Sequence, residues 1–534
     1  MYKTIVGLEV HVELDTKSKM FCSCLNDPDE RHPNVNVCPI CMGHPGTLPV
    51  INEEAVRKVI RTGLALNCQI PEYSKFDRKN YFYPDLPKGY QISQYDMPLC
   101  KAGFLEIEGK KIRITRVHLE EDTGRLVHEK DYSLVDFNRA GIPLMELVTE
   151  PDITSAKHAR MFAEELQLIL RYLDVSEANM EKGQMRVEAN ISLGLGSKLG
   201  TKVEIKNLNS FRSLEKGIEY EIIRQAKLLK AGKKVAQETR GWLDKATASS
   251  RRVAGARVDD VKGITVSQRE KEEAHDYRYF PEPDLPPLHF TNKEIQEIRA
   301  EVPELPQARR ERFEKEYKLG NKEIEVFVQN KDLGEYFEKV VSEFPSRLAA
   351  GKLSQLVKLA TNYLITDLQG LLKGASVVGE DFLITPENFA EFITLITERG
   401  EAERRLKRRK SSLITERGEQ SKPREGEDER SSSTSEGKIS SKIAKTVLQE
   451  MFSKGADPSN IIEEKGLTQI TDESEIKKII GEVISKNPKP VEDYKKGKEN
   501  AFQYLIGQIM AKTQGKASPQ IVNKILKQLL TKTK

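Results

Sequence analysis

From Gly7 to Leu14, apolar and ionisable residues alternate without a break. Successive side chains of a β-strand point to opposite faces of its sheet. A strand here would therefore carry Glu9, His11 and Glu13 on one face and aliphatic residues on the other. A half-exposed strand with a wetted polar face is the simplest interpretation. Carboxylates beside an imidazole also suit a hard cation, so this strand is the first candidate for chemistry.

Two more acidic clusters follow strand-like segments. Residues 118–122 are His-Leu-Glu-Glu-Asp at the end of an alternating run, and Glu146 ends the segment Pro-Leu-Met-Glu. If one sheet brings these clusters to the first strand, they form a site suited to Mg²⁺ and a nucleotide. Alternation places Glu120 and Glu121 on opposite faces unless a bulge intervenes.

Four of the six cysteines form two close pairs, Cys22 with Cys24 and Cys38 with Cys41. In a reducing cytoplasm such pairs bind one tetrahedral zinc ion more readily than they form disulfides. Four sulfur ligands leave no position open for water, so we expect a structural site. Four ordinary buried cysteines are the alternative. Cys68 and Cys100 stand alone and are expected to be structural.

With 534 residues, the chain exceeds what one core usually organises, so two or three domains are expected. The first half has short alternating segments broken by Gly, Pro and Asn. This pattern predicts an α+β fold with a large, mainly antiparallel sheet and inserted helices, after Ser155 and from about Ser213. Beyond Asn292, amphipathic patterns such as Lys352 to Leu372 and Lys438 to Phe452 predict a helical second half.

Two stretches depart from these patterns. Residues 399–437 are rich in Arg, Lys, Glu, Ser and Gly, and they cannot bury enough apolar surface to offset the entropy lost on ordering. We predict a disordered insertion there and a surface loop over residues 243–261. Near the end, Ser518 followed by Pro519 predicts the start of the last helix.

The overall charge says little about partners, because Lys and Arg outnumber Asp and Glu by only 86 to 82. From Asn500 to the end there are six lysines and no acidic residue. That segment can meet phosphates, with a solubilising tail as the alternative. Neither a bilayer-length apolar run nor a cleavable leader is evident, so we expect a cytoplasmic protein without membrane contact.

The stretch from Arg78 to Gln91 combines cations, amides and aromatic residues. Cations attract phosphates and aromatic rings stack on bases, whereas a core of aromatics with scattered surface lysines is the alternative. The sequence contains neither a Gly-x-x-x-x-Gly-Lys-Ser/Thr phosphate loop nor a Gly-x-Ser-x-Gly elbow or Gly/Ser-rich amidase signature. A nucleotide would therefore have to bind without a phosphate-binding loop of this kind. Because the serine motifs are absent from the sequence, we do not expect glutamine hydrolysis on this chain.

Several segments together resemble the B subunits of glutamyl/aspartyl-tRNA(Gln/Asn) amidotransferases. They are residues 6–14, 76–85, 206–211, 279–284, 507–510 and 517–520. The resemblance covers nearly the whole chain apart from the two departing stretches. It implies a cradle-like sheet domain with a zinc loop over residues 1–292 and a helical domain over residues 293–385. A small helical tail domain that binds tRNA would follow over residues 386–534, interrupted by the disordered insertion.

The resemblance also implies the reaction and the partners. In this family ATP phosphorylates the side-chain carboxylate of Glu-tRNA(Gln) or Asp-tRNA(Asn), and ammonia from a glutaminase subunit then displaces the phosphate. This order makes chemical sense, because a carboxylate resists amines until its oxygen becomes a good leaving group. The implied partners are the amidase (A) subunit and a small C subunit of a heterotrimer, with the aminoacyl-tRNA as substrate.

Carried onto this sequence, the family motifs imply Mg²⁺ ligands at Glu9, His11, Glu121 and Glu146, with Glu120 as the substitute if the strand register differs by one. For phosphate contacts we expect the cations Arg78, Lys79 and Lys88. For the tRNA 3′ end or the adenine we expect Tyr81 and Tyr83. One rival interpretation is an RNA-binding scaffold without ATP chemistry, and the intact acidic set argues against it. A zinc-dependent hydrolase is another, and four cysteine ligands leave it no open metal position.

Overall fold

A computed structural model describes most of the chain: residues 2–195, 198–244, 263–270, 277–345, 348–397, 441–467, 473–513, 516–517 and 519–532. The chain divides into two compact units, residues 1–308 and residues 309–534. The predicted insertion at 399–437, nearly all of the predicted loop at 243–261 and the predicted cap Ser518 lie outside the described residues.

An eight-stranded sheet forms the centre of the first unit, with the order β13-β12-β11-β10-β1-β9-β6-β5. Its strands are β1 (Lys3–Glu13), β5 (Cys100–Ile107), β6 (Lys110–Glu121), β9 (Pro143–Thr149), β10 (Met185–Gly194), β11 (Val203–Leu208), β12 (Glu238–Leu243) and β13 (Ile264–Glu270). Neighbouring strands are antiparallel except for β11 and β12, which are parallel. The prediction of a mainly antiparallel sheet in an α+β fold is confirmed.

β1 lies inside the sheet between β10 and β9, and its two faces differ as the alternation predicts. Leu8, Val10 and Val12 are buried, whereas Glu9 and His11 remain partly exposed. The aliphatic face joins the main hydrophobic core of this unit. Burial of the aliphatic face determines which side chains of β1 point into the core. A shift of the strand by one residue would bring the ionisable side chains there instead.

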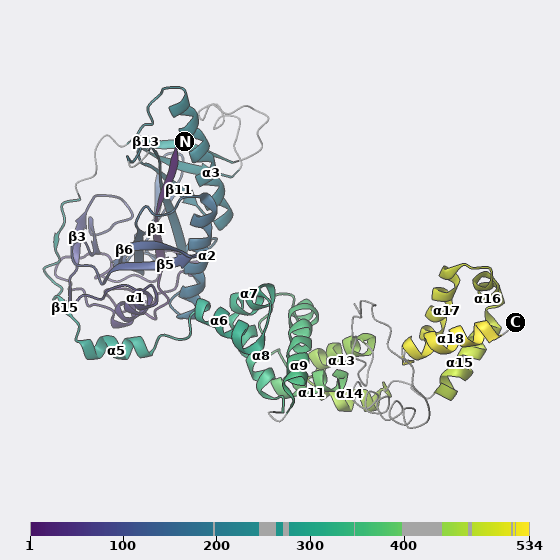
Figure 1. The fold of residues 1–534 in the computed structure, drawn as a ribbon. Helices are drawn as coiled ribbons and strands as arrows, with labels where there is room; N and C mark the ends of the chain where they lie inside the picture. The colour runs from purple at the N-terminus through teal and green to yellow at the C-terminus, as the bar shows by residue number, and fades with distance from the viewer. Residues whose placement is uncertain are drawn as a thin grey trace, which may run out of the picture. The chain divides into compact units, whose positions relative to one another are not determined.

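Three helices contribute buried residues to the same core: α1 (Glu53–Ala65), α2 (Ala156–Tyr172) and α3 (Phe211–Lys230). The Ser155 hydroxyl accepts a hydrogen bond from the His158 amide at 3.2 Å and caps α2. Ser210 caps α3 in the same way, so this predicted helix starts slightly earlier than expected. In Figure 1, α2 and α3 lie along one side of the large sheet, with β3 on the other side.

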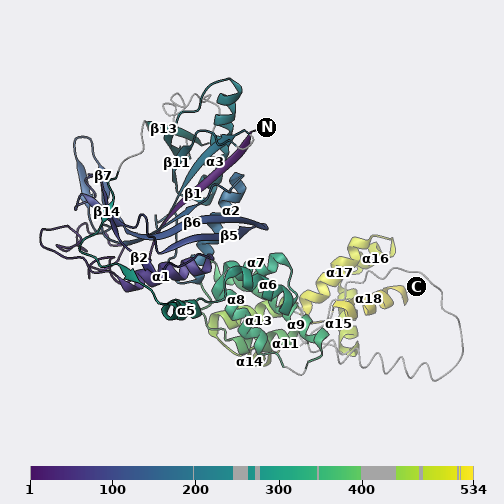
Figure 2. The same cartoon turned by 60° about the vertical axis from the view of Figure 1, so that its left-hand side comes forward.

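Smaller sheets lie beside the large one. β14 (Phe280–Pro281), β3 (Asp77–Asn80) and β4 (Tyr90–Ser93) form a three-stranded sheet, while β2 (Tyr73–Ser74) pairs with β15 (Leu288–His289) and β7 (Arg125–His128) with β8 (Ser133–Asp136). Figure 2 shows β7 and β14 on the side of the large sheet away from α2 and α3. The ionisable face of the large sheet therefore looks toward strands instead of a helical layer.

Helices make up the rest of the described chain, beginning with α5 (Asn292–Ala300) and α6 (Pro306–Tyr317). They continue as α7 (Asn321–Gln329), α8 (Lys331–Ser342), α9 (Ala350–Asn362), the π-helix η1 (Tyr363–Leu368), α10 (Gln369–Leu372), α11 (Pro386–Thr397), α13 (Ser441–Lys454), α14 (Pro458–Glu464), α15 (Glu473–Lys486), α16 (Pro488–Lys495), α17 (Glu499–Lys512) and α18 (Pro519–Lys532). The described part of the chain has no strand after β15, which confirms the prediction of a helical second half.

The last four helices, α15 to α18, share a small core that includes Ile480, Leu505 and Leu526. In the final helix, Ile525 and Leu526 are buried in this core, and Ile521 and Leu529 pack against it. Among the described residues, no helix is both long and apolar enough to span a membrane.

Candidate active site

One row of side chains crosses three neighbouring strands on the ionisable face of the large sheet. Glu146 of β9 is the direct partner of His11 of β1 and of His118 of β6. Side chains of cross-strand partners on one face are close neighbours. His11 Nε2 lies 3.4 Å from Glu146 Oε2, and His118 Nε2 lies 3.5 Å from the same oxygen. The row therefore brings two imidazoles onto one carboxylate.

Glu9 and Glu120 lie beside this row, two residues along β1 and β6. His11 Nε2 is 3.9 Å from Glu9 Oε1 and 3.7 Å from Glu120 Oε1. Ligand atoms of Glu9, His11 and Glu146 all lie within 4.8 Å of one another, and the same holds for His118, Glu120 and Glu146. This carboxylate-rich donor set fits a hard divalent cation. We call these five residues the acidic cluster.

The protonation of the acidic cluster follows from its burial and its charges. Burial opposes a charge on His11, but contact with Glu146 and the charges of Glu120 and Glu9 raise the pKa of His11 to about 9. Burial also opposes ionisation of Glu146, yet His118 and His11 hold its pKa well below the ordinary value. Burial and the neighbouring Glu146 raise the pKa of Glu9. An added cation would compete with the proton on His11.

Glu121 does not lie in the acidic cluster, although the sequence predicts it as a ligand beside His11. The register of β6 with β9 is continuous from Arg116 to Glu121, so Glu120 and Glu121 point to opposite faces. On its own face, Glu121 Oε2 lies 2.6 Å from Lys88 Nζ, and Glu121 Oε1 accepts a hydrogen bond from the Ile92 amide at 2.9 Å. Glu120, the substitute considered from the sequence, occupies the place beside His11.

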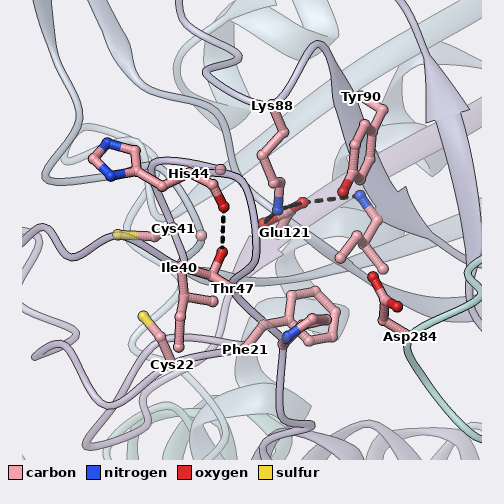
Figure 3. A pocket seen from close by; sticks show the side chains of 14 residues that line it. Phe21, Cys22, Ile40, Cys41, His44, Thr47, Lys88, Tyr90, Glu121 and Asp284 are labelled. Atoms are coloured by element: carbon pink, nitrogen blue, oxygen red, sulfur yellow. Dashed lines mark hydrogen bonds and ion pairs between the residues drawn. The ribbon is translucent and has the colours of Figure 1, made fainter.

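Lys88 and Glu121 line a cavity of about 60 Å³ that also borders the cysteine loop. Figure 3 shows Lys88 pointing onto Glu121, with Tyr90 beside the pair and Cys22 and Cys41 on the far side of the cavity. The Lys88 side chain is largely buried in this ion pair. Lys88 therefore forms an ion pair with Glu121 on the face of β6 opposite the acidic cluster. The sequence predicts a phosphate contact for Lys88 instead.

Arg78 of β3 also contacts partners within the protein. Its guanidinium donates to both carboxylate oxygens of Glu282, at 2.7 and 2.8 Å, and lies over the Tyr90 ring at 4.2 Å from the centroid. The Glu282 side chain is 0% exposed, so this bidentate pair neutralises a buried charge. Arg78 thus pairs with a buried carboxylate, and its predicted phosphate contact stays a prediction.

Lys79, the next residue, faces the other way. Its ammonium lies 5.1 Å from the centroid of the Tyr277 ring. Burial would lower the pKa of Lys79, but the charges of Glu120 and Glu146 outweigh burial and raise it. The Ser93 hydroxyl of β4 donates to Glu120 at 3.1 Å, and Ser93 pairs with Asp77, two residues along β3 from Lys79. This face of β3 therefore adjoins the acidic cluster. Of the three predicted phosphate contacts, Lys79 is the cation on the face that adjoins this cluster.

The predicted tyrosines differ in their surroundings. Tyr81 is partly buried and packs edge-on against Tyr277, with ring centroids 5.9 Å apart. Burial raises its pKa, and so does the charge of Glu120, although Lys79 acts in the opposite direction. Tyr83 lies further out and is largely exposed. Tyr81 therefore packs against the ring that Lys79 contacts, whereas Tyr83 is exposed to solvent.

A second charged group adjoins the acidic cluster at the end of β1. Arg139 lies 3.1 Å from Glu13 Oε1 and donates to Asp122, which also contacts Arg186 at 3.0 Å. Burial is the main cause that raises the pKa of Glu13, to about 7, while Arg139 opposes the rise. Arg186 is the register partner of His11 on β10. The charged face thus continues across β10.

The four paired cysteines come together as their spacing predicts. The sulfur atoms of Cys22, Cys24, Cys38 and Cys41 all lie within 4.8 Å of one another. Lys19, only 1% exposed, donates to the Ala140 carbonyl at 2.8 Å, and its Nζ lies 4.0 Å from Cys41 Sγ. The sulfur cluster is compatible with a structural zinc ion. Cys68 and Cys100 are buried away from it.

Sequence reasoning did not assign a role to His118, Tyr277 or Tyr279. The alternation of residues 112–121 places His118 beside Glu120, so a stricter use of the strand period would have identified it. Tyr277 and Tyr279 reach the site through the pairing of β14 with β3, across about 200 residues of sequence. No local pattern indicates that pairing.

Comparisons with known proteins identify relatives of this chain. Residues 4–296 match the family model of the GatB/GatE catalytic domain, and residues 431–530 match that of the GatB domain. The B subunit of the aspartyl/glutamyl-tRNA(Asn/Gln) amidotransferase of Thermoanaerobacter pseudethanolicus is 45% identical, over 99% of this chain and 100% of that protein. The proteins of the same name from Thermotoga maritima and Persephonella marina are 44% and 45% identical, each over 99% of both chains.

Proposed function

The chain belongs to the family of aspartyl/glutamyl-tRNA(Asn/Gln) amidotransferase B subunits, and we propose that it uses ATP to activate the side-chain carboxylate of Glu-tRNA(Gln) or Asp-tRNA(Asn). Ammonia supplied by a glutaminase subunit then gives Gln-tRNA(Gln) or Asn-tRNA(Asn). Activation transfers the γ-phosphoryl group of ATP to a carboxylate oxygen and releases ADP. Ammonia then attacks the acyl carbon, phosphate leaves, and a proton is lost from nitrogen.

The observation that carries this proposal is the row of His11, Glu146 and His118 across three strands. Backbone pairing within a sheet holds this row, so its donor atoms are positioned without a mobile loop. Phosphoryl transfer depends mainly on such positioning and on charge stabilisation. A half-exposed strand with a wetted polar face would not need two histidines on one carboxylate.

We propose Glu9, His11, Glu120 and Glu146 as the residues that hold Mg²⁺. Their oxygen-rich donor set fits this ion. When bound, Mg²⁺ neutralises the negative charge that otherwise repels a carboxylate from a nucleotide. His118 contacts both Glu120 and Glu146 and orients these two carboxylates.

We propose Lys79 as the phosphate-binding cation of the site. Lys79 lies on the face of β3 that adjoins the acidic cluster, and the charges of Glu120 and Glu146 raise its pKa. A fixed positive charge here attracts the phosphates of the nucleotide and the carboxylate of the substrate, both of which the acidic cluster repels. Arg78 and Lys88 have structural roles in this proposal, since each is paired with a buried carboxylate.

We further propose that Cys22, Cys24, Cys38 and Cys41 hold a structural zinc ion. All four donors are sulfur, which suits a closed tetrahedral site. Lys19, buried beside Cys41, offsets part of the negative charge of such a site. Because Lys19 also donates to Ala140, zinc would connect the cysteine loop to the turn that precedes β9.

The remaining parts of the proposal concern partners. The amidase (A) subunit supplies ammonia and a small C subunit completes a cytoplasmic heterotrimer. The tail over residues 386–534 binds the tRNA, supported by the six lysines and absent acidic residues after Asn500. The sheet region up to residue 292 carries the chemistry, and the helical region over 293–385 connects it to the tail.

The test is amide formation on Glu-tRNA(Gln) by the reconstituted complex, with Mg-ATP and free ammonia. Free ammonia bypasses the amidase partner and isolates the activity of this chain. We expect His11→Ala and Glu9→Gln to lose ATP-dependent product while tRNA binding is retained. Undiminished product in both variants would move the phosphoryl transfer elsewhere and leave this chain as a tRNA-holding scaffold.

A further inference from the structure

A continuous group of tyrosine rings borders the acidic cluster on the side of the three-stranded sheet. The Tyr277 ring contacts Tyr81 and Tyr279, with centroids 5.9 and 6.1 Å apart. Tyr279 in turn stacks on Tyr95, with centroids 4.2 Å apart and ring planes at 10°. The rings come from three separate segments, and the pairing of β14 with β3 brings them together. They form one surface instead of isolated core aromatics.

This surface begins at the acidic cluster. Lys79 contacts the Tyr277 ring. Burial raises the pKa of Tyr279 to about 12, and the charges of Glu120 and Glu146 add to the rise against the effect of Lys79. The Ser93 hydroxyl of β4 donates to Glu120 at 3.1 Å, and Ser93 pairs with Asp77, two residues along β3 from Lys79. The three-stranded sheet therefore adjoins the acidic cluster on the face that carries Lys79. A ligand placed on the rings has one end at the proposed site of phosphoryl transfer.

The surface also extends outward into solvent. Tyr95, which stacks on Tyr279, is 61% exposed. The Tyr95 amide donates to the buried carboxylate of Asp77 at 3.1 Å, which fixes the backbone under this exposed ring. Exposed aromatic rings on a fixed backbone are typical of binding surfaces.

We propose that these aromatic side chains form a stacking track for the unpaired 3′-terminal nucleotides of the tRNA, whose aminoacyl end would lie beside Lys79. This inference rests on the proposed function. Rings stack on bases without regard to sequence, and a neighbouring cation binds the backbone phosphates. Every tRNA substrate presents the same kind of single-stranded end, so such a track suits the task.

The length of the track favours RNA over the adenine of ATP. A nucleotide whose phosphates lie at the acidic cluster needs one pocket for one base. The ring contacts instead run from Lys79 through Tyr277 and Tyr279 to the exposed Tyr95, which suits several consecutive bases that lead outward to the tRNA body. The adenine of ATP is therefore the alternative occupant that the experiment must distinguish.

The test uses the complete amidotransferase complex and Glu-tRNA(Gln) that carries 2-aminopurine in place of its 3′-terminal adenine. Stacking quenches 2-aminopurine fluorescence, so binding is read without turnover. We expect Tyr95→Ala to weaken quenching and to raise KM for the tRNA on the order of ten-fold, with KM for ATP unchanged. Tyr95→Phe, which keeps the ring, should restore both. Tyr132→Ala, an exposed tyrosine of the β7–β8 hairpin, is the matched control.

Two outcomes would overturn the track. If Tyr95→Ala and Tyr279→Leu both leave quenching and KM for the tRNA unchanged, the rings do not bind the 3′ end. If KM for ATP rises and that for the tRNA does not, the rings hold the adenine of ATP. Failure of the proposed function can be distinguished from failure of the track. In that case the native complex would quench the probe but would form no ATP-dependent amide.

Discussion

His11 and Glu146 are direct partners in the register of β1 with β9, and His11 Nε2 lies 3.4 Å from Glu146 Oε2. Sheet pairing thus holds a charged imidazole against the carboxylate that it would share with a metal ion. The contact stabilises the protonated ring and opposes metal binding at the same time. Much of the chemistry of this site should therefore depend on pH.

The first prediction concerns metal affinity. His11 has its pKa raised to about 9 from the usual 6.5, so its ring is protonated at neutral pH without metal. A metal binds only the neutral ring. Mg²⁺ affinity should rise up to about ten-fold per pH unit toward about pH 9 and then level off. Calorimetric titration at several pH values measures this, with His11→Gln as the control. A flat profile for the native chain would contradict the prediction.

Stability without metal should depend on pH in the opposite direction. Because the folded-state pKa of His11 is raised to about 9, its contribution is complete below about pH 6.5 and is lost as pH rises through about 9. In EDTA, the Tm of the native chain should fall over this window relative to that of His11→Gln. Parallel Tm curves for the two proteins would show that the ion pair adds no stability.

Adjacent glutamates of β6 should give different phenotypes. Glu120→Gln removes a donor from the acidic cluster and should weaken Mg²⁺ binding and amide formation with little change in Tm. Glu121→Gln leaves the buried Lys88 unpaired and should lower the free energy of unfolding by about 3 kcal/mol, with Mg²⁺ binding retained. Calorimetry and thermal unfolding of both variants provide the measurement. A double change, Lys88→Met with Glu121→Gln, should recover part of the lost stability.

Substitutions of the two adjacent cations of β3 should also give different phenotypes. Lys79→Gln should lower kcat for ATP-dependent amide formation in a folded protein, because it removes the cation on the face of β3 that adjoins the acidic cluster. Arg78→Gln leaves the fully buried Glu282 uncompensated and should destabilise the fold by about 3 kcal/mol. Kinetics and Tm measured together decide between the roles. A stable Arg78→Gln protein with impaired ATP use would reverse the assignment.

Zinc content should follow the cysteine pairs. Metal analysis should find one zinc ion per native chain and much less in Cys38→Ser, with a lower Tm, because the four sulfurs lie within bonding reach of one ion. Cys68→Ala, a buried thiol outside the cluster, is the control and should keep the metal. Turnover per folded chain should not change, since a closed site has no position for substrate. Direct inhibition of folded enzyme by zinc removal would argue for a catalytic ion.

The sequence alone predicted the features that depend on local periodicity. Alternation from Gly7 to Leu14 identified β1 and its ionisable face, and the spacing of the cysteines predicted their cluster. The same period also indicated that Glu120 and Glu121 point apart. The family resemblance, which rests on short motifs, led to the family that the comparisons then showed.

Tertiary structure decided which of these residues meet. Glu146 lies between His11 and His118 only because β9 pairs with both β1 and β6. Arg78 donates a hydrogen bond to Glu282, and Lys79 lies over the Tyr277 ring, although about 200 residues of sequence separate each pair. The alternation of a strand predicts which face of the sheet a side chain lies on. The residue that the side chain contacts there depends on strand order and register. Those depend on burial of the whole apolar face, a property that no local segment contains.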